Sequence, residues 1–169
     1  VHQEKIEATR DFIEEMNGEP LLIGVNFDHE AQALKYYLDL LLKTDIPYFG
    51  GTGLKGAAAA AAIDRWNERK LPVLMANVQS AAHGLTLQHG GSSILYYSLT
   101  YNWGDYTQFN ARVDREGQKN EVTISHLISP GTVDELVLSV LNGREGNDAA
   151  FFNHLKEYRN VRRKAGKKA

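Results

Sequence analysis

The chain has 169 residues, of which 43% are hydrophobic and 24% are charged, and its formal net charge is −2. This composition is typical of a soluble domain with its own core, and no apolar run reaches the roughly 18 to 20 residues that a membrane-spanning helix needs, so we expect no membrane partner. The absence of cysteine excludes disulfides and thiolate metal sites and favours a reducing, cytoplasmic location.

The predicted elements alternate between helices and strands along the chain. Short apolar runs predict strands at 21–27, 46–49, 72–78, 92–98 and 122–128. Helix-prone stretches lie at 3–17, 29–43, 56–69, 104–116, 131–142 and 148–161. Several strands are almost continuously apolar, as strands covered on both faces are. This order predicts an α/β fold with three layers, in which a mainly parallel sheet has helices on both faces.

The residues that follow each strand are the first candidates for a site, because such sheets bind ligands beyond the carboxyl ends of their strands. Asp28 follows the first strand and stands where the N-cap of the next helix belongs. Far along the chain, residues 159–169 contain six of the 19 basic side chains and no acidic one. We therefore predict a domain at 1–158 and a basic, flexible tail at 159–169. The tail would either neutralise nucleic-acid phosphates or form a solvated end.

The second strand-to-helix turn contains Gly51, Gly53 and Gly56 in the order G-x-G-x-x-G. A dinucleotide-binding fingerprint has this order, but it belongs to the first such turn and needs an acidic residue at the end of the next strand. The next strand ends in MANVQSA, without an acid. A P-loop is missing too, because Ala57 and Ala58 stand where Lys and a hydroxyl are required. The pattern therefore favours neither NAD nor a self-sufficient nucleotide site, and the scattered histidines predict no metal site.

The segment QFNARVDREGQ, 108–118, is the most informative part of the chain. Arg112 and Arg115 are three residues apart and Gln108 is four before Arg112, so on a helix they share one face, which Gly117 would end. Two adjacent guanidinium groups suit the oxygens of a phosphate. The alternative is a solvated helix face on which both arginines pair with nearby carboxylates.

A second segment, 76–93, follows the third strand and contains the small residues Ser80, Ala81, Ala82 and Gly84. Small residues let backbone N–H groups approach a phosphate closely. The alternative is a tight loop that needs small residues only for packing.

Together the two segments resemble motifs V and VI of superfamily 2 helicases and translocases, in particular the Swi/Snf-like group and its phage-type members. The resemblance rests on AAHGLTLQ (81–88), SILYYSLTYNW (93–103), QFNARVDREGQ (108–118), VTISHLI (122–128) and GTVDELV (131–137). Upstream, LLIGVNF (21–27) resembles motif IV. The likeness covers nearly all of 1–158 and implies the second, C-terminal RecA-like domain of a two-domain motor.

The resemblance implies a role for each motif VI residue. Arg115 would be the arginine finger that reaches the γ-phosphate of ATP across the domain cleft, Arg112 its partner on the phosphates, and Gln108 would help to position them. Gly84 and Thr86 would lie near the nucleotide. ATP would bind with Mg²⁺, held mainly by an N-terminal RecA-like domain that contributes the P-loop and the acidic ligands.

The resemblance also implies a nucleic-acid track and partners. The track would include Phe27, Gly51, Thr52, Ser80 and Ala81. The expected partners are DNA, with RNA as the open alternative, and the N-terminal RecA-like domain, in the cytoplasm of the host if a phage encodes the protein. The alternative is a stand-alone, non-catalytic nucleic-acid-binding or adaptor domain of the same fold.

Three departures from the family pattern weaken single contacts. Thr86 stands where Asn is usual, and Asp114 where His is common. Ala57–Ala62 occupies a stretch that is usually polar.

Overall fold

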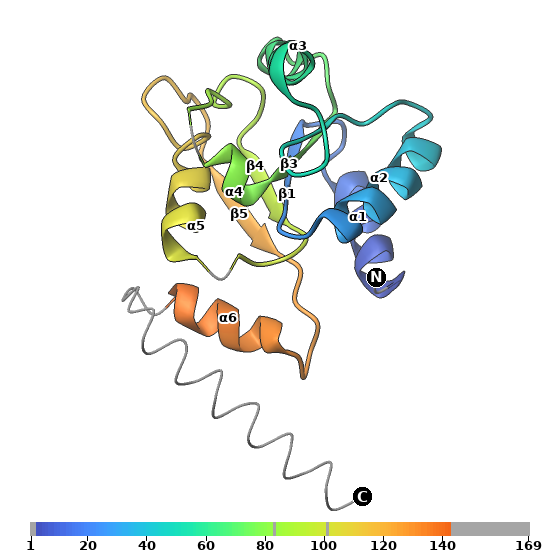
Figure 1. Cartoon of the computed structure of the whole chain (residues 1–169), viewed down its shortest axis with the longest axis vertical. Coiled ribbons are helices and arrows are strands. Elements are labelled where there is room, and N and C mark those ends of the chain that lie inside the picture. The colour runs from blue at the N-terminus through green and yellow to red at the C-terminus, as the bar shows by residue number, and fades with distance from the viewer. Residues whose placement is uncertain (1–2, 83, 101, 143–169) are drawn as a thin grey trace, which may run out of the picture.

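The centre of the computed structural model is a five-stranded sheet with the strand order β2-β3-β1-β4-β5 (Figure 1). The structure describes residues 3–82, 84–100 and 102–142. Every neighbouring pair of strands is parallel, which confirms the predicted α/β class. The strands are β1 (Leu21–Val25), β2 (Tyr48–Phe49), β3 (Val73–Asn77), β4 (Ser93–Tyr96) and β5 (Thr123–His126).

Helices follow the strands along the chain, and each predicted strand within the described residues is present in a shorter form. The helices are α1 (Gln3–Glu15), α2 (Asp28–Leu42), α3 (Gly56–Asn67), α4 (Val78–Ala81), α5 (Trp103–Asn110) and α6 (Val133–Asn142). None of the described helices is long and apolar enough to cross a membrane. The helix predicted at 148–161 and the basic tail at 159–169 lie outside the described residues.

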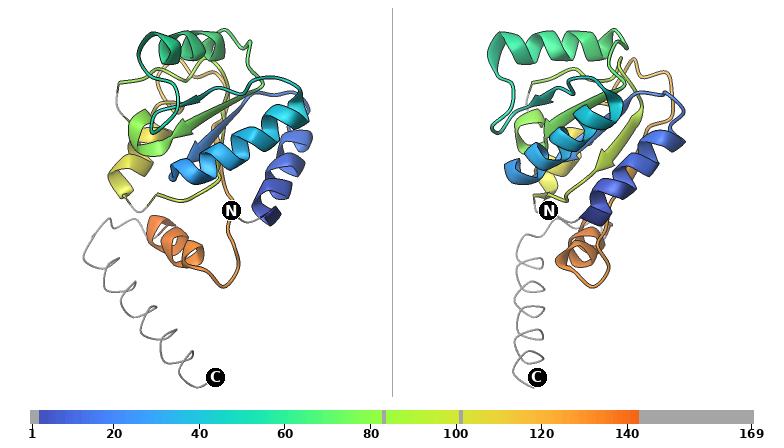
Figure 2. Two further views of the ribbon diagram at one scale, coloured as in Figure 1. Left: turned by 45° about the vertical axis from the view of Figure 1, so that its right-hand side comes forward. Right: turned by 90° about the vertical axis from the view of Figure 1, so that its right-hand side faces the viewer.

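Two hydrophobic cores lie on opposite faces of the sheet, since successive residues of a strand point to opposite faces. On one face Leu21, Ile23 and Val25 of β1 pack with the apolar side chains of α1 and α2. On the other face Leu22 belongs to a core that includes side chains of α3, α4, α5 and α6. Figure 2 shows the helices on both sides of the sheet. This double cover explains why the central strands β1 and β3 are almost entirely apolar.

Trp66, on α3, is fully buried and fixes the segment that leads into β4. Its indole Nε1 donates a hydrogen bond to the carbonyl oxygen of Leu87 over 2.9 Å. The ring also occupies the space beside Gly90, where an added Cβ would lie 2.2 Å from Nε1. The backbone of this segment is therefore set by packing rather than by its own turn chemistry.

The helix predicted at 104–116 is wrong in its second half. The α-helix ends at Asn110, with Ala111 as its C-cap, and the chain continues as successive turns. Val113 is fully buried in these turns, and its N–H donates to the carbonyl of Asn110 at 3.0 Å. Arg112 and Arg115 lie in these turns beyond the helix, so the shared helical face of Gln108, Arg112 and Arg115 does not form.

The predicted N-cap at Asp28 is also wrong. Phe27 is the N-cap of α2 and makes no side-chain cap bond, and Asp28 is the first helical residue. The short helix α4 has a true side-chain cap, because Oδ1 of Asn77 accepts from the N–H of Ser80 at 3.0 Å.

Candidate functional site

Three loops at the carboxyl ends of β1, β2 and β3 lie side by side, and we call residues 26–28, 50–54 and 77–80 the three-loop surface. The N–H of Gly51 donates to Oγ of Ser80 over 3.2 Å. That hydroxyl in turn donates to Oδ1 of Asn77 over 3.1 Å. Parallel strands end at the same edge of a sheet, so residues about 25 positions apart in sequence become neighbours here.

Asp28 joins the first of these loops to the second. Its Oδ1 accepts from the Tyr48 hydroxyl at 2.7 Å and from the N–H of Thr52 at 3.0 Å. The Thr52 hydroxyl accepts from Nε2 of Gln32 at 3.2 Å. The sequence pattern predicted Asp28 only as a helix cap. In the structure its carboxylate instead holds the backbone of Thr52, a predicted nucleic-acid contact.

The electrostatics of this pair keep the loop contact intact around neutral pH. The Tyr48 hydroxyl, followed by the Thr52 N–H, stabilises the carboxylate and lowers the pKa of Asp28 below its ordinary value. Burial and then the hydrogen bond to Asp28 raise the pKa of the Tyr48 hydroxyl. Because the depressed pKa belongs to an acid, the contribution of this contact is present above the ordinary pKa of Asp and is lost as pH falls through the lower, folded-state value.

The glycines of the second loop are required by space as well as by conformation. Gly51 has φ +52°, and an added Cβ would lie 2.1 Å from Oδ1 of Asp28. Gly50 has φ +77°, and its Cβ would lie 2.3 Å from Cβ of Ser80. The loop can lie this close to its neighbours only with glycine at both positions.

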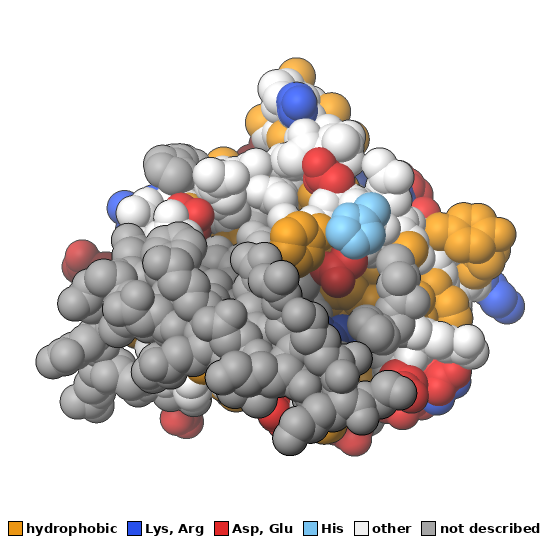
Figure 3. All heavy atoms as spheres, turned by 60° about the horizontal axis from the view of Figure 1, so that its bottom comes forward, with side chains coloured by type: hydrophobic (Ala, Val, Ile, Leu, Met, Phe, Trp, Pro, Cys, Tyr) orange, Lys and Arg blue, Asp and Glu red, His pale blue; other side chains and the backbone are white. Residues whose placement is uncertain are grey.

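Four of the five predicted nucleic-acid residues belong to the three-loop surface. Phe27 is 38% exposed, and its ring centroid lies 5.8 Å from that of His29. Gly51, Thr52 and Ser80 lie next to it along the surface. Ala81 is fully buried, so its side chain belongs to the core beneath. Figure 3 shows hydrophobic, acidic and histidine side chains among the described residues of the face at the bottom of Figure 1, with few Lys or Arg.

The two segments that suggested motifs V and VI are bonded to each other in the structure. Nε and Nη2 of Arg112 donate to the carbonyl oxygen of Ala82 over 3.1 and 2.5 Å. The carbonyl of Arg112 accepts from the N–H of Leu87 at 3.2 Å. Nε2 of Gln88 donates to the carbonyl of Glu116 over 3.0 Å. The half-buried Arg112 is therefore an anchor between the segments in this structure.

Arg115 differs from Arg112 in its surroundings. Its side chain is exposed, and its guanidinium has no hydrogen-bond or ion-pair partner within the part of the chain that the structure describes. The ion pairs considered as an alternative for the two arginines are absent from those residues. An unpaired, exposed guanidinium on an anchored turn is available for an anionic ligand.

The remaining predicted nucleotide residues are exposed on the same two segments and on α5. Gly84 has φ +73°, and no atom lies within 4 Å of where a Cβ would be added. The carbonyl of the exposed Thr86 accepts from Nδ2 of Asn67 at 2.7 Å. Gln108 is exposed on the last turn of α5. Among residues 3–82, 84–100 and 102–142, no group of three or more His, Asp or Glu side chains could hold a metal ion, so none is assigned as a Mg²⁺ ligand.

Gln118 ends the motif that contains both arginines, and its spacing predicted no role for it. Its Nε2 donates to the carbonyls of Gln88 at 2.9 Å and Gly91 at 3.1 Å. Its Oε1 accepts from the N–H groups of Lys119 at 3.0 Å and Asn120 at 3.2 Å. The only signal for it was its fixed place after the second arginine, in R-x-x-R-x-G-Q.

Curated relatives of the chain include a phage protein and a eukaryotic helicase. Protein p41 of Acyrthosiphon pisum secondary endosymbiont phage 1 is 29% identical over 85% of this chain and 30% of its own length. The human DNA annealing helicase and endonuclease ZRANB3 is 27% identical over 90% of this chain and 14% of its own length. The chain thus spans less than a third of either relative. No protein-family model matches it.

Two solved structures share the fold. The C-terminal part of the Fun30 ATPase domain has a TM-score of 0.70 at 19% identity and covers 93% of this chain and 57% of its own. The Sulfolobus solfataricus SWI2/SNF2 ATPase core in complex with dsDNA has a TM-score of 0.70 at 22% identity, over 93% of this chain and 35% of its own. The chain therefore shares its fold with these two ATPase structures, and it is similar in sequence to the phage protein and to the annealing helicase.

Proposed function

We propose that the chain is the second half of an ATP-dependent DNA helicase or translocase motor, in which Arg115 completes an ATP site shared with an N-terminal RecA-like domain. The observation that carries this proposal is the contrast between the two arginines. Arg112 is held by the Ala82 carbonyl, whereas Arg115 is exposed and unpaired within the described residues. A rigid turn that presents one free guanidinium suits the stabilisation of charge on a transferring phosphoryl group.

In this proposal Arg112 positions the turn, and its contact with the nucleotide phosphates would require release of the Ala82 carbonyl. Gly84, Thr86 and Gln108 would line the same side of the cleft. ATP would bind together with Mg²⁺, and the N-terminal domain would supply most of the ligands of the metal ion. The motor would work in the cytoplasm, of the host if a phage encodes it.

The three-loop surface would hold the DNA backbone, with RNA as the alternative polymer. The glycines give a phosphate close access to the second loop, and the Thr52 hydroxyl, which accepts from Gln32, can donate its own proton to that phosphate. Support comes from the relatives, one of which is a DNA annealing helicase and one an ATPase core solved with dsDNA. Phe27 supplies an exposed ring on which a base or sugar can pack.

Phe27→Ala is expected to weaken DNA binding by the chain by about tenfold, because stacking on one aromatic ring contributes roughly 1–3 kcal/mol. The measurement is fluorescence anisotropy of labelled single-stranded and duplex oligonucleotides at one fixed salt concentration. Tyr36→Ala is the matched control, since Tyr36 is a 72% exposed ring on α2 away from the three loops. Equal loss in both variants, or none in either, would contradict the placement of DNA on this surface.

A further inference from the structure

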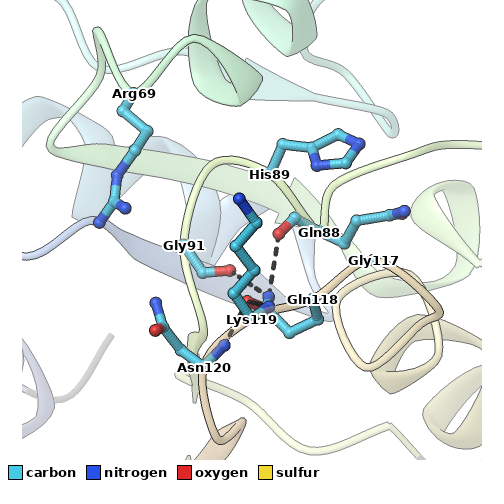
Figure 4. A pocket seen from close by; sticks show the side chains of 8 residues that line it. All are labelled: Arg69, Gln88, His89, Gly91, Gly117, Gln118, Lys119 and Asn120. Carbon is cyan, nitrogen blue, oxygen red and sulfur yellow. Dashed lines mark hydrogen bonds between the residues drawn. The ribbon is translucent and has the colours of Figure 1, made fainter.

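A polar cavity of about 270 Å³ lies at the amino-end edge of the sheet, away from the three-loop surface (Figure 4). Three segments form it: the turn that follows α3, the segment that leads into β4 and the segment that leads into β5. Its lining residues are Arg69, Gln88, His89, Gly91, Gly117, Gln118, Lys119 and Asn120. None of them belongs to the nucleotide or nucleic-acid residues described above.

The floor of this cavity is fixed before any ligand arrives. The side-chain amide of Gln118 bonds to the carbonyls of Gln88 and Gly91 and to the N–H groups of Lys119 and Asn120, at 2.9 to 3.2 Å. Gly91 is buried, and an added Cβ there would lie 2.8 Å from the carbonyl oxygen of Pro20. A rigid floor lowers the entropic cost of ordering the site when a ligand binds.

The rim of the cavity carries hydrogen-bond donors and positive charge. Figure 4 shows Arg69, Lys119 and His89 around the opening. Lys119 is exposed and its ammonium has no partner within the described segments. Arg69 pairs with Glu19 at 3.0 Å, but both side chains are half exposed or more. Such a surface pair is worth little, so the guanidinium stays available to a second anion.

The charge of the rim decides which ligand fits. The guanidinium of Arg69 and the ammonium of Lys119 are cationic hydrogen-bond donors at one cavity. Such donors match the oxygens of a phosphate or of a phosphate ester.

We propose that this cavity is a second phosphate-binding site, in which Lys119 and Arg69 hold the oxyanion above the Gln118 floor. Its lining residues Gln88 and Gly117 are two residues from Thr86 and Arg115, so a bound phosphate would contact and stabilise both segments. The proposal does not depend on the ATP role of Arg115, because it concerns binding by the 169-residue chain alone.

The first test is a titration of the chain with inorganic phosphate, in which NMR detects the shifts of the backbone amides. Chloride keeps the ionic strength constant. Saturable shifts are expected at 88–91 and 117–120. Lys119→Gln should weaken this binding by about tenfold, the worth of one charge-assisted hydrogen bond. The matched control is Lys43→Gln, which removes an equally exposed lysine at the end of α2 and should leave the affinity unchanged.

A second arm replaces inorganic phosphate by a short DNA duplex and so separates the two sources of phosphate. Shifts of the same amides with both probes, and a smaller salt dependence in Lys119→Gln, would assign the site to the nucleic-acid backbone. Shifts with inorganic phosphate alone would assign it to a small phosphate compound. The proposal is overturned if neither probe gives saturable shifts there, or if the two glutamine variants lose equal affinity.

Discussion

Arg115→Ala is expected to lower ATP turnover by about 10³-fold or more in a protein that contains this chain and its N-terminal RecA-like domain, with little change in ATP binding. An arginine finger acts on charge that develops during phosphoryl transfer, and its loss has effects of roughly 10³ to 10⁵ in turnover. The ground-state nucleotide would still be held by the other domain. Turnover is measured under saturating ATP and DNA, and ATP binding by a fluorescent analogue.

Arg65→Ala is the control for loss of a surface charge. Arg65 is exposed on α3 and forms no ion pair within the described residues, so its removal should leave turnover nearly unchanged. Arg112→Ala should instead lower both turnover and the free energy of unfolding, because its guanidinium anchors the Ala82 carbonyl. Turnover of Arg115→Ala within about twofold of the parent would show that this residue is not the finger.

Gly51→Ala is expected to reduce DNA affinity by about tenfold or more and to cost about 1–3 kcal/mol of unfolding free energy. The added Cβ would lie 2.1 Å from Oδ1 of Asp28 and 2.8 Å from the Tyr48 hydroxyl, so the loop must move and the Thr52 N–H loses its acceptor. The positive φ adds a conformational cost of roughly 1 kcal/mol. Oligonucleotide anisotropy and denaturant unfolding measure the two effects.

Gly56→Ala separates the steric effect from the conformational one. Gly56 has φ +55°, close to the +52° of Gly51, but no atom lies within 4 Å of its added Cβ. It should show the conformational cost and retain DNA affinity. If both alanine variants bind DNA equally well, the close packing of the three loops is not what presents the phosphate contact.

The sequence allowed the sheet to be predicted well because several strands, β1 and β3 above all, are almost continuously apolar runs between polar turns. It failed where a distant contact overrides a local pattern. The spacing of Gln108, Arg112 and Arg115 fits a helix, but α5 ends at Asn110, and the turns that follow bury Val113 in the core.

Asp28 is the clearest case in the candidate site. A carboxylate before an amphipathic stretch predicts an N-cap, yet its partners are Tyr48 and Thr52, 20 and 24 residues along the chain. Only the parallel topology brings those residues together. The positions of Phe27, Gly51, Thr52 and Ser80 at one edge did follow from the sequence, since Phe27 ends a predicted strand and the other three lie within three residues of the end of one.

A chain that contributes half of a divided ATP site should not hydrolyse ATP by itself. ATP turnover by the 169-residue chain, with and without DNA, is therefore expected at the background level. DNA-stimulated turnover is expected when the N-terminal RecA-like domain, with its P-loop and Mg²⁺ ligands, is present on the same polypeptide. Robust turnover by the 169-residue chain alone would show that the ATP site is not divided in this way.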